Sequence, residues 1–237
     1  MNKLNNSIKR SLIKILAKRG FKILNTNYFN TINDLTSRER DILNYIIDKK
    51  LTMTSKDNLA ATILSVRYTV RNNIGGDFVE CGVWRGGHSI AAALTFELYN
   101  SDKKVFCFDT FQGMTKPTYL DKDTAFNSSA MEKYSALNNS EYNAWCYSPI
   151  DQVINNFNEA GISSDRFKLI KGDVLETLPK FKSGNISILR LDTDWYESTR
   201  KELEFLWPNL TKFGVLIIDD YGHWAGSKKA VDEFFKS

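Results

Sequence analysis

Beyond the glycine pair Gly75-Gly76, the sequence alternates between short runs of β-branched and aromatic residues and longer amphipathic segments. The short runs, expected to be strands, are residues 78–81, 105–108, 167–170, 186–191 and 215–218. The segments with apolar residues at helical spacing are 89–99, 150–160, 174–181, 196–207 and 227–235. This alternation predicts an α/β fold, in which a mostly parallel sheet carries helices on both faces.

The residues before this alternation are expected to form an N-terminal helical cap, residues 1–73, on a main domain of residues 74–237. Apolar residues at three- and four-residue spacing predict helices over 37–49 and 56–71, with Ser37 and Ser55 as their N-caps. Residues 1–22 have the pattern of a basic amphipathic helix without acidic residues. Such a helix docks on its own domain, on a second subunit or, less commonly, on an anionic membrane surface.

Composition limits the classes of partner. The net charge of the 237 residues is +4, and no Lys/Arg block is interleaved with aromatic residues, which argues against nucleic acid. No stretch approaches the roughly 20 apolar residues that span a bilayer. The three cysteines form no CxxC pair, so a reducing, cytoplasmic setting is the expectation.

Residues 111–149 form a connection far longer than the usual one between a strand and a helix. At the carboxyl end of a strand, such a segment suggests a substrate-binding insertion or lid. The alternative is a solvated surface loop, which would not need the apolar groups of Phe126, Tyr142, Trp145 and Tyr147.

A glycine-rich turn, Glu80 to Gly87, follows the first predicted strand and precedes a helix. Glycine at Gly82 allows close backbone approach, and the helix N-terminus offers free N–H groups to an anionic ligand. The next two strands end in Asp109 and Asp173, and an acid such as Asp109 accepts both hydroxyls of a ribose. Glycines also serve simple tight turns, and Asp173 also fits a helix N-cap. Together, the three acidic strand ends favour a nucleoside-bearing cofactor.

The last two strands end in two acidic pairs, Asp192 with Asp194 and Asp219 with Asp220. If these strands are neighbours, four carboxylates meet in one small region, and like charges so close repel unless a cation binds or protons are retained. Oxygen ligands of this kind suit Mg²⁺ or Mn²⁺. The alternative is that Asp194 and Asp220 cap helices and solvent screens the rest.

Five segments, in this order and spacing, resemble the macrocin O-methyltransferase family: ECGVWRGG, FDTFQGM, KGDVLETLP, LRLDTDWYEST and IIDDYGHWAGSKKAVDEF, within residues 77–235. The resemblance implies a Rossmann-like methyltransferase sheet, S-adenosylmethionine as methyl donor and a bound Mg²⁺ (or Mn²⁺). It also implies a small-molecule hydroxyl acceptor, expected to be a sugar or a glycosylated natural product. The residue roles that it implies are metal binding by Asp192, Asp219 and Asp220, general-base catalysis by Asp194, and a cofactor pocket lined by Glu80, Gly82, Asp109 and Asp173.

Two departures from the family pattern matter. Family members continue into two more strands, so the sequence is expected to be a truncated form that lacks the last strands of the fold. The expected assembly is a homodimer or higher homo-oligomer, and loss of the last strands is expected to weaken both folding and dimerisation. The segment 113–149, which is expected to choose the substrate, is only loosely family-like.

Several alternatives stay open from the sequence. His223 is a rival base, because an imidazole titrates at a pH of about 6.5. Arg85 is expected either to meet the cofactor carboxylate or to pair with Glu80, and His88 is expected to be structural. Trp195, Tyr196 and Trp224 are candidates for an aromatic wall against a sugar ring, although core packing is the commoner fate of such residues.

Two other functions compete with methyl transfer. A nucleotide-sugar glycosyltransferase also uses a DxD arrangement, here Asp192-Thr193-Asp194, around a metal-bound diphosphate. A non-catalytic binding protein that kept the cofactor crevice is the second, and the intact set of four acids argues against it.

Overall fold

The computed structural model describes residues 34–125, 128–182 and 184–236. Residues Leu35–Ser237 form one compact unit, which holds both the predicted sheet and the two helices expected before it. The basic helix predicted in residues 1–22 lies outside the described residues, so the helical cap of residues 1–73 stays a prediction.

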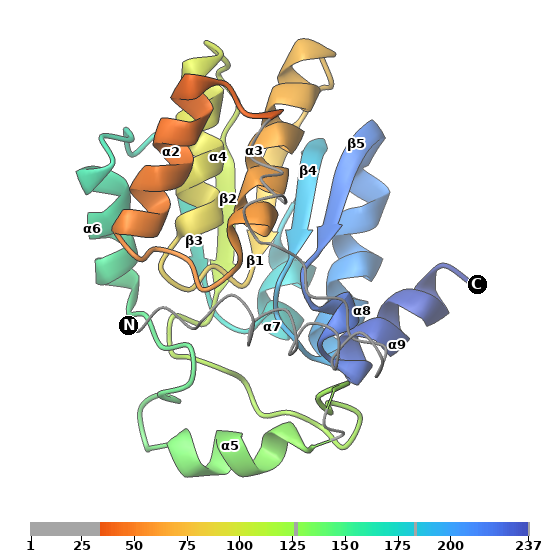
Figure 1. Ribbon diagram of the computed structural model, residues 1–237. Coiled ribbons are helices and arrows are strands. Elements are labelled where there is room, and N and C mark those ends of the chain that lie inside the picture. The colour runs from red at the N-terminus through yellow and green to blue at the C-terminus, as the bar shows by residue number, and fades with distance from the viewer. Residues whose placement is uncertain (1–33, 126–127, 183, 237) are drawn as a thin grey trace, which may run out of the picture. The chain divides into compact units, whose positions relative to one another are not determined.

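The centre of the unit is a five-stranded parallel sheet (Figure 1). Its strands are β1 (Asp77–Cys81), β2 (Val105–Asp109), β3 (Phe167–Lys171), β4 (Ile186–Leu191) and β5 (Leu210–Ile218), in the order β3-β2-β1-β4-β5. This confirms the predicted α/β class, and the last two strands are neighbours, which is the condition for the two acidic pairs to meet. Strands β2 and β3 lie on one side of β1, and β4 and β5 lie on the other. The strand order therefore reverses between β1 and β4. Ligands of open α/β sheets bind at such a reversal, beyond the carboxyl ends of the strands.

The helices cover both faces of this sheet. Helices α2 (Ser37–Asp48), α3 (Lys56–Arg71) and α4 (Gly87–Leu98) pack on one another, and α4 contacts β1 and β2. On the other face, α7 (Val174–Thr177), α8 (Tyr196–Leu206) and α9 (Ala225–Phe234) bury one apolar cluster with the strands. Helix α6 (Ile150–Glu159) leads into β3. No helix in the described ranges has both the length and the apolar character needed to cross a membrane.

The helix starts show how local chemistry sets the boundaries. Ser55 is the N-cap of α3, as predicted, and its hydroxyl accepts from the Asn58 amide at 3.1 Å. The prediction of Ser37 for α2 is wrong by one residue: Thr36 is the N-cap, and it forms a capping box with Glu39. The glutamate three residues later favours Thr36 as the N-cap, because its carboxylate accepts a hydrogen bond from the Thr36 amide at 2.7 Å.

Strand β5 begins five residues earlier than the prediction of 215–218. Its first half contains the exposed Lys212 and Phe213 together with Gly214, so it lacks the apolar pattern of a buried strand. Pairing with β4 extends it, with a register irregularity between Ile186 and Ile188. By contrast, all six residues of β4 are buried, including Arg190.

The long connection between β2 and α6 is folded over the carboxyl end of the sheet and contains a helix that the sequence did not predict, α5 (Ala130–Leu137) (Figure 1). Two contacts fasten it to the start of α8. The buried carboxylate of Asp121 accepts from the Tyr196 amide at 2.8 Å, and the Trp195 indole donates to the Thr115 carbonyl at 3.0 Å. Because α8 has no side-chain cap of its own, Asp121 satisfies one of its free N–H groups from outside the helix.

Candidate active site

Backbone hydrogen bonding between neighbouring strands continues past the strand ends. It holds the predicted site residues side by side. Backbone hydrogen bonds link Gly172 to Asp109, Gly82 to Phe108, Asp192 to Cys81, and Asp219 to Leu191, at 2.8–3.0 Å. Each residue that follows its strand is thus held beside the end of the next strand. The predicted site residues therefore share one edge of the sheet.

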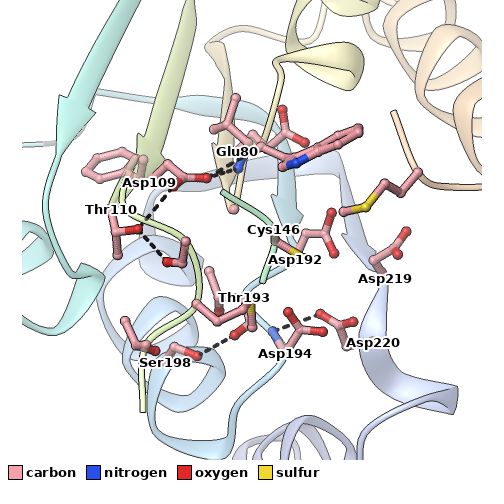
Figure 2. Close-up of a pocket in the computed structure, with 18 of the residues that line it drawn as sticks. Glu80, Asp109, Thr110, Cys146, Asp192, Thr193, Asp194, Ser198, Asp219 and Asp220 are labelled. Atoms are coloured by element: carbon pink, nitrogen blue, oxygen red, sulfur yellow. Dashed lines mark hydrogen bonds between the residues drawn. The ribbon is translucent and has the colours of Figure 1, made fainter. Parts of the chain in front are cut away.

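A cavity of about 440 Å³ lies at this edge. The glycine-rich turn, Glu80, Asp109 and Asp173 line one part of it, and the two acidic pairs line the other. Figure 2 shows the two parts in one view, with Asp109 and Glu80 on one side and Asp192, Asp219, Asp220 and Asp194 on the other. The structure therefore brings all eight predicted site residues to one hollow, which is also lined by residues 51–54 of the loop between α2 and α3.

Asp109 holds the glycine-rich turn in place. One of its carboxylate oxygens accepts from the amides of Val83 at 2.7 Å and Trp84 at 3.0 Å, and the other accepts from the Phe111 amide at 2.7 Å. Burial raises the pKa of Asp109, and these amides oppose that rise. A carboxylate has about four lone-pair positions, and the Thr110 hydroxyl also lies 3.4 Å from one oxygen, so this arrangement leaves room for at most one hydrogen bond from a ligand.

Gly82 is required by close packing within the chain. Its φ is +82°, and a Cβ at this position would lie 1.8 Å from the Asp192 carbonyl oxygen. Glycine at this turn therefore lets the ends of β1 and β4 meet. This places the part of the cavity that the glycine-rich turn lines directly beside the part that the two acidic pairs line.

We expect Gly82→Ala to lower the free energy of unfolding by about 3 kcal/mol, from overpacking and left-handed strain together. Gly161→Ala is the matched control, because Gly161 has a φ of +78° but no atom within 4 Å of an added Cβ. Gly161→Ala should introduce the backbone strain without the clash, and should lower the free energy of unfolding by about 1 kcal/mol. Urea unfolding of both variants measures the difference, and equal losses would contradict the packing role of Gly82.

Glu80 and Asp173 have partners that the sequence left open. The buried Glu80 carboxylate accepts from the Ser89 hydroxyl and pairs with Arg190 at 2.8 Å. Burial raises the pKa of Glu80 to about 7, and Arg190 opposes that rise. Asp173 is the N-cap of α7 and accepts from the Leu175 amide at 2.9 Å, so it serves the capping role considered for it.

The two acidic pairs converge. Ligand oxygens of Asp192, Asp219 and Asp220 all lie within 4.8 Å of one another, the arrangement expected of a shared cation site. Asp220 is buried, and Asp192 and Asp219 are partly buried. Burial and the neighbouring carboxylates raise the pKa of Asp220, because two charges so close cannot both stay ionised at low cost.

Asp194 lies next to this trio in an unusual backbone conformation, with φ of +67°. Its amide donates to the Asp220 carboxylate at 3.0 Å, which helps to fix the position of Asp220. Burial, followed by the charge of Asp192, raises the pKa of Asp194 to about 7. A carboxyl group with such a pKa suits proton transfer near neutral pH.

Arg190 is the functional candidate that the sequence analysis missed. Its guanidinium is fully buried and pairs with Glu80, Asp192 and Asp219 at 2.6–2.8 Å. The available signal was an arginine inside a mainly apolar strand, two positions before Asp192. A buried arginine requires anionic partners, and the nearby strand ends supply them.

His223, His88 and Arg85, the other candidates from the sequence, lie outside the acidic cluster. The His223 side chain is 61% exposed and lies 3.4 Å from Asp123. His88 is buried between the hydroxyls of Thr54 and Thr62, each at 2.8 Å, as its expected structural role requires. Arg85 lies over the Trp84 ring and donates to the Lys50 carbonyl at 3.4 Å, while Glu80 is paired with Arg190.

The tryptophans pack mainly on one another. The rings of Trp195 and Trp224 are buried and meet edge to face, with centroids 5.0 Å apart, and Trp145 from the long connection closes the group. Tyr196 points to α9, where its hydroxyl donates to Glu233 at 2.7 Å. Trp145 and Trp224 line the cavity, so part of this packed group still faces a ligand.

Comparison with known proteins agrees with this geometry. The macrocin O-methyltransferase (TylF) family matches residues 5–237, nearly the whole chain. The chain belongs to this family. The match confirms the predicted resemblance, and it favours a methyltransferase over the glycosyltransferase alternative.

Curated members of the family are similar over much of the chain. An 8-demethyl-8-(2,3-dimethoxy-α-L-rhamnosyl)-tetracenomycin-C 4′-O-methyltransferase of Streptomyces olivaceus is 34% identical over 70% of this chain and 59% of its own. Demethyldecarbamoylnovobiocin O-methyltransferase of Streptomyces niveus is 31% identical over 71% of this chain and 62% of its own. The matched region thus spans about three fifths of the length of these relatives.

Solved structures show the same fold. The O-methyltransferase NovP superposes with a TM-score of 0.67 at 30% identity, over 78% of this chain and 74% of NovP. The calicheamicin methyltransferase CalS11 has a TM-score of 0.59 at 19% identity, over 98% of this chain and 86% of its own, which supports the fold alone. The Rossmann-like methyltransferase sheet that the resemblance implied is therefore confirmed.

Proposed function

We propose that the protein is an S-adenosylmethionine- and Mg²⁺-dependent O-methyltransferase that acts on a hydroxyl group of a small molecule, with a sugar as the acceptor. The observation that carries this proposal is the single cavity that joins the glycine-rich turn to the acidic cluster. Methyl transfer requires that the donor and an activated hydroxyl meet in one space in line, and this cavity provides both parts. Family membership supports the reaction class.

The donor fits the part of the cavity formed by Glu80, Gly82, Asp109 and Asp173. Asp109 faces it from the end of β2, where an acid can accept ribose hydroxyls. The N-terminus of α4 follows the turn and offers N–H groups to a carboxylate. In this proposal, Asp109 contributes twice, because it also shapes the turn through the Val83 and Trp84 amides.

The acidic part fits a divalent cation. Among the described residues there, five carboxyl groups, Glu80, Asp192, Asp194, Asp219 and Asp220, lie near one buried guanidinium, that of Arg190, which pairs with Glu80, Asp192 and Asp219. The negative charge of the cluster is therefore not balanced. Burial, and after it the charge of the neighbouring carboxylates, raises the pKa of Asp194 and of Asp220. Asp192, Asp219 and Asp220 would hold the cation, since carboxylate oxygens are ligands that Mg²⁺ and Mn²⁺ prefer. When bound there, such a cation lowers the pKa of a nearby hydroxyl, as it does for water.

The chain's own residues then perform two tasks. Asp194 takes the proton of the acceptor hydroxyl, while the acceptor oxygen bonds to the methyl carbon and the carbon–sulfur bond breaks. The products are a methyl ether, S-adenosylhomocysteine and a proton on Asp194. The long connection, residues 111–149, excludes water from this part of the cavity through Trp145 and Met114, which line it.

The acceptor class follows from the relatives and from the cavity wall. The relative from Streptomyces olivaceus acts, by its name, on the 4′-oxygen of a rhamnosyl group. In this chain, Trp145 lines the cavity, with the ammonium of Lys133 4.0 Å from its ring centre. An aromatic face beside a polar group suits the apolar face and hydroxyls of a sugar ring.

Ligand-dependent stability tests the proposal. S-adenosylhomocysteine at about 100 times its Kd should stabilise the protein by about 2.7 kcal/mol, whereas uridine diphosphate added with Mn²⁺ should give no shift beyond that of Mn²⁺ alone. Methyl transfer from radiolabelled donor is then measured against free and nucleotide-linked deoxysugars with Mg²⁺. Stabilisation by the diphosphate alone would support the glycosyltransferase instead. Binding of donor without consumption over this panel would favour a binding protein.

A further inference from the structure

Arg190 occupies one oxygen on each of two acids of the cation site. Its Nη1 donates to Asp192 Oδ2 at 2.6 Å, and its Nη2 donates to Asp219 Oδ1 at 2.8 Å. The same Asp219 oxygen also accepts from the Asn58 side-chain amide at 3.2 Å. Each carboxylate is therefore left with its second oxygen for an ion.

The guanidinium that makes these bonds cannot turn away. Arg190 is fully buried, and Nη1 is also bound to Glu80 Oε1 at 2.8 Å, so both ends of the planar group are held. The third acid is constrained in a similar way, because Asp220 Oδ2 accepts from the Asp194 amide at 3.0 Å. Figure 2 shows the carboxylates of Asp192, Asp219 and Asp220 around one common space.

This pattern bears on which ion the site can accept. Ca²⁺ takes six to eight oxygen ligands and commonly uses both oxygens of a carboxylate, whereas Mg²⁺ keeps six ligands in a tight octahedron with several waters. An acid with one oxygen committed to a fixed arginine provides a single ligand. Asp220, whose Oδ2 accepts from the Asp194 amide, is likewise left with one oxygen, and three acids with one ligand each leave half of an octahedron open for water and an acceptor oxygen.

We propose that Arg190 is a positioning residue that limits Asp192 and Asp219 to one coordinating oxygen each, so that the site selects Mg²⁺ or Mn²⁺ over Ca²⁺. This inference rests on the proposed function in one respect, that the acidic trio binds a divalent cation. Arginine is suited to the task because its fork donates in two directions at once. A lysine keeps the charge but has one nitrogen, which cannot reproduce the bonds to both aspartates.

Calorimetric titration of Mn²⁺, Mg²⁺ and Ca²⁺ into the metal-free wild-type protein and Arg190→Lys tests the proposal without an activity assay. In the wild type, we expect the Kd for Ca²⁺ to exceed that for Mn²⁺ by at least tenfold. Removal of a group that orients metal ligands weakens binding by about 10–100-fold. In Arg190→Lys, the Mn²⁺ affinity should fall by this factor while the Ca²⁺ affinity changes little, so the ratio of the Kd for Ca²⁺ to that for Mn²⁺ should fall by about the same 10–100-fold.

Arg67→Lys is the matched control for replacing a paired arginine. Arg67 pairs with the buried Glu39 at 2.8 Å and does not line the cavity, so its replacement should leave the Kd ratio unchanged. Asn58→Ala removes the other donor to Asp219 and should also preserve the ratio, because Arg190 still holds that oxygen.

The outcomes separate this inference from the proposed function. If wild-type protein binds no divalent cation, the metal part of the proposed function fails together with the inference. If it binds Mn²⁺ but Arg190→Lys keeps the wild-type ratio, the inference alone is overturned. Should Arg190→Lys not fold, infrared difference spectra of wild-type protein with Mn²⁺ decide, because one-oxygen and two-oxygen carboxylate coordination differ in the splitting of the carboxylate stretches. Two-oxygen coordination by Asp192 or Asp219 would overturn the proposal.

Discussion

Asp219→Asn is expected to lower the methyl-transfer rate by about 10³-fold or more while the affinity for S-adenosylhomocysteine stays within about twofold of wild type. Asp219 belongs to the acidic trio whose ligand oxygens lie within 4.8 Å of one another. Asparagine keeps an oxygen that accepts from Arg190, but it removes the charge that attracts the cation. Loss of metal activation costs several kcal/mol in the transition state, and about 4 kcal/mol corresponds to a factor of about 10³.

The measurement combines a turnover assay with titration of S-adenosylhomocysteine. Donor binding should survive, because Asp109 and Asp173 line the other part of the cavity. Asp232→Asn is the control, since it removes a carboxylate from the exposed side of α9, where Asp232 pairs with Lys228 at 3.0 Å. Chelation of divalent ions should reproduce the Asp219→Asn loss in the wild type. Full turnover after thorough metal removal would refute the role of the acidic trio.

The charge balance of the site explains why this effect should be large. The single positive charge of Arg190 neutralises part of the negative charge of the cluster. The remaining negative charge is shared by Asp192, Asp194, Asp219 and Asp220. Burial, followed by the charge of Asp192, raises the pKa of Asp194 to about 7, so the cluster retains protons near neutral pH when no cation is bound. A divalent ion substitutes for these protons. Metal binding should therefore release protons, as it does wherever ligands must be deprotonated.

The sheet and its acidic edge were predictable from the sequence for a physical reason. Parallel strands all end at the same edge, so an acid directly after each of several strands must converge with the others once the strands are neighbours. Asp109, Asp192 and Asp219 follow this rule, and the register carries it past the strand ends. Residue spacing within the chain was therefore enough to predict which acids share this edge of the sheet.

Arg190 shows where such reasoning stops. Its partners come from β1 and from the end of β5, and their positions depend on pairing across the sheet. A single charged residue in an apolar strand signals a buried ion pair but does not identify the partner. Helix α5 was missed for a related reason, because packing of Trp145 against Trp195 and Trp224 anchors its segment, and such long-range contacts leave no local period.

Asp194→Asn is expected to reduce kcat by about 10²–10⁴-fold, the usual contribution of a positioned base, without loss of Mn²⁺ or S-adenosylhomocysteine binding. The asparagine keeps the backbone amide that donates to Asp220 at 3.0 Å, so the acidic trio should stay in place. It cannot accept the acceptor's proton. His223→Ala is the control, because His223 is the rival base but its side chain is 61% exposed; this variant should retain turnover within a few-fold.

The pH dependence gives this prediction a second readout. The carboxylate form of Asp194 is the base, so the wild-type kcat should fall as the pH drops through the pKa of this group. Burial and the charge of Asp192 raise that pKa to about 7 in the metal-free protein, and a bound divalent ion favours the carboxylate and lowers it. The acid limb of the profile should therefore lie below pH 7 with Mg²⁺ and be absent from Asp194→Asn. A limb that persists in Asp194→Asn and disappears in His223→Ala would transfer the role of base to the histidine.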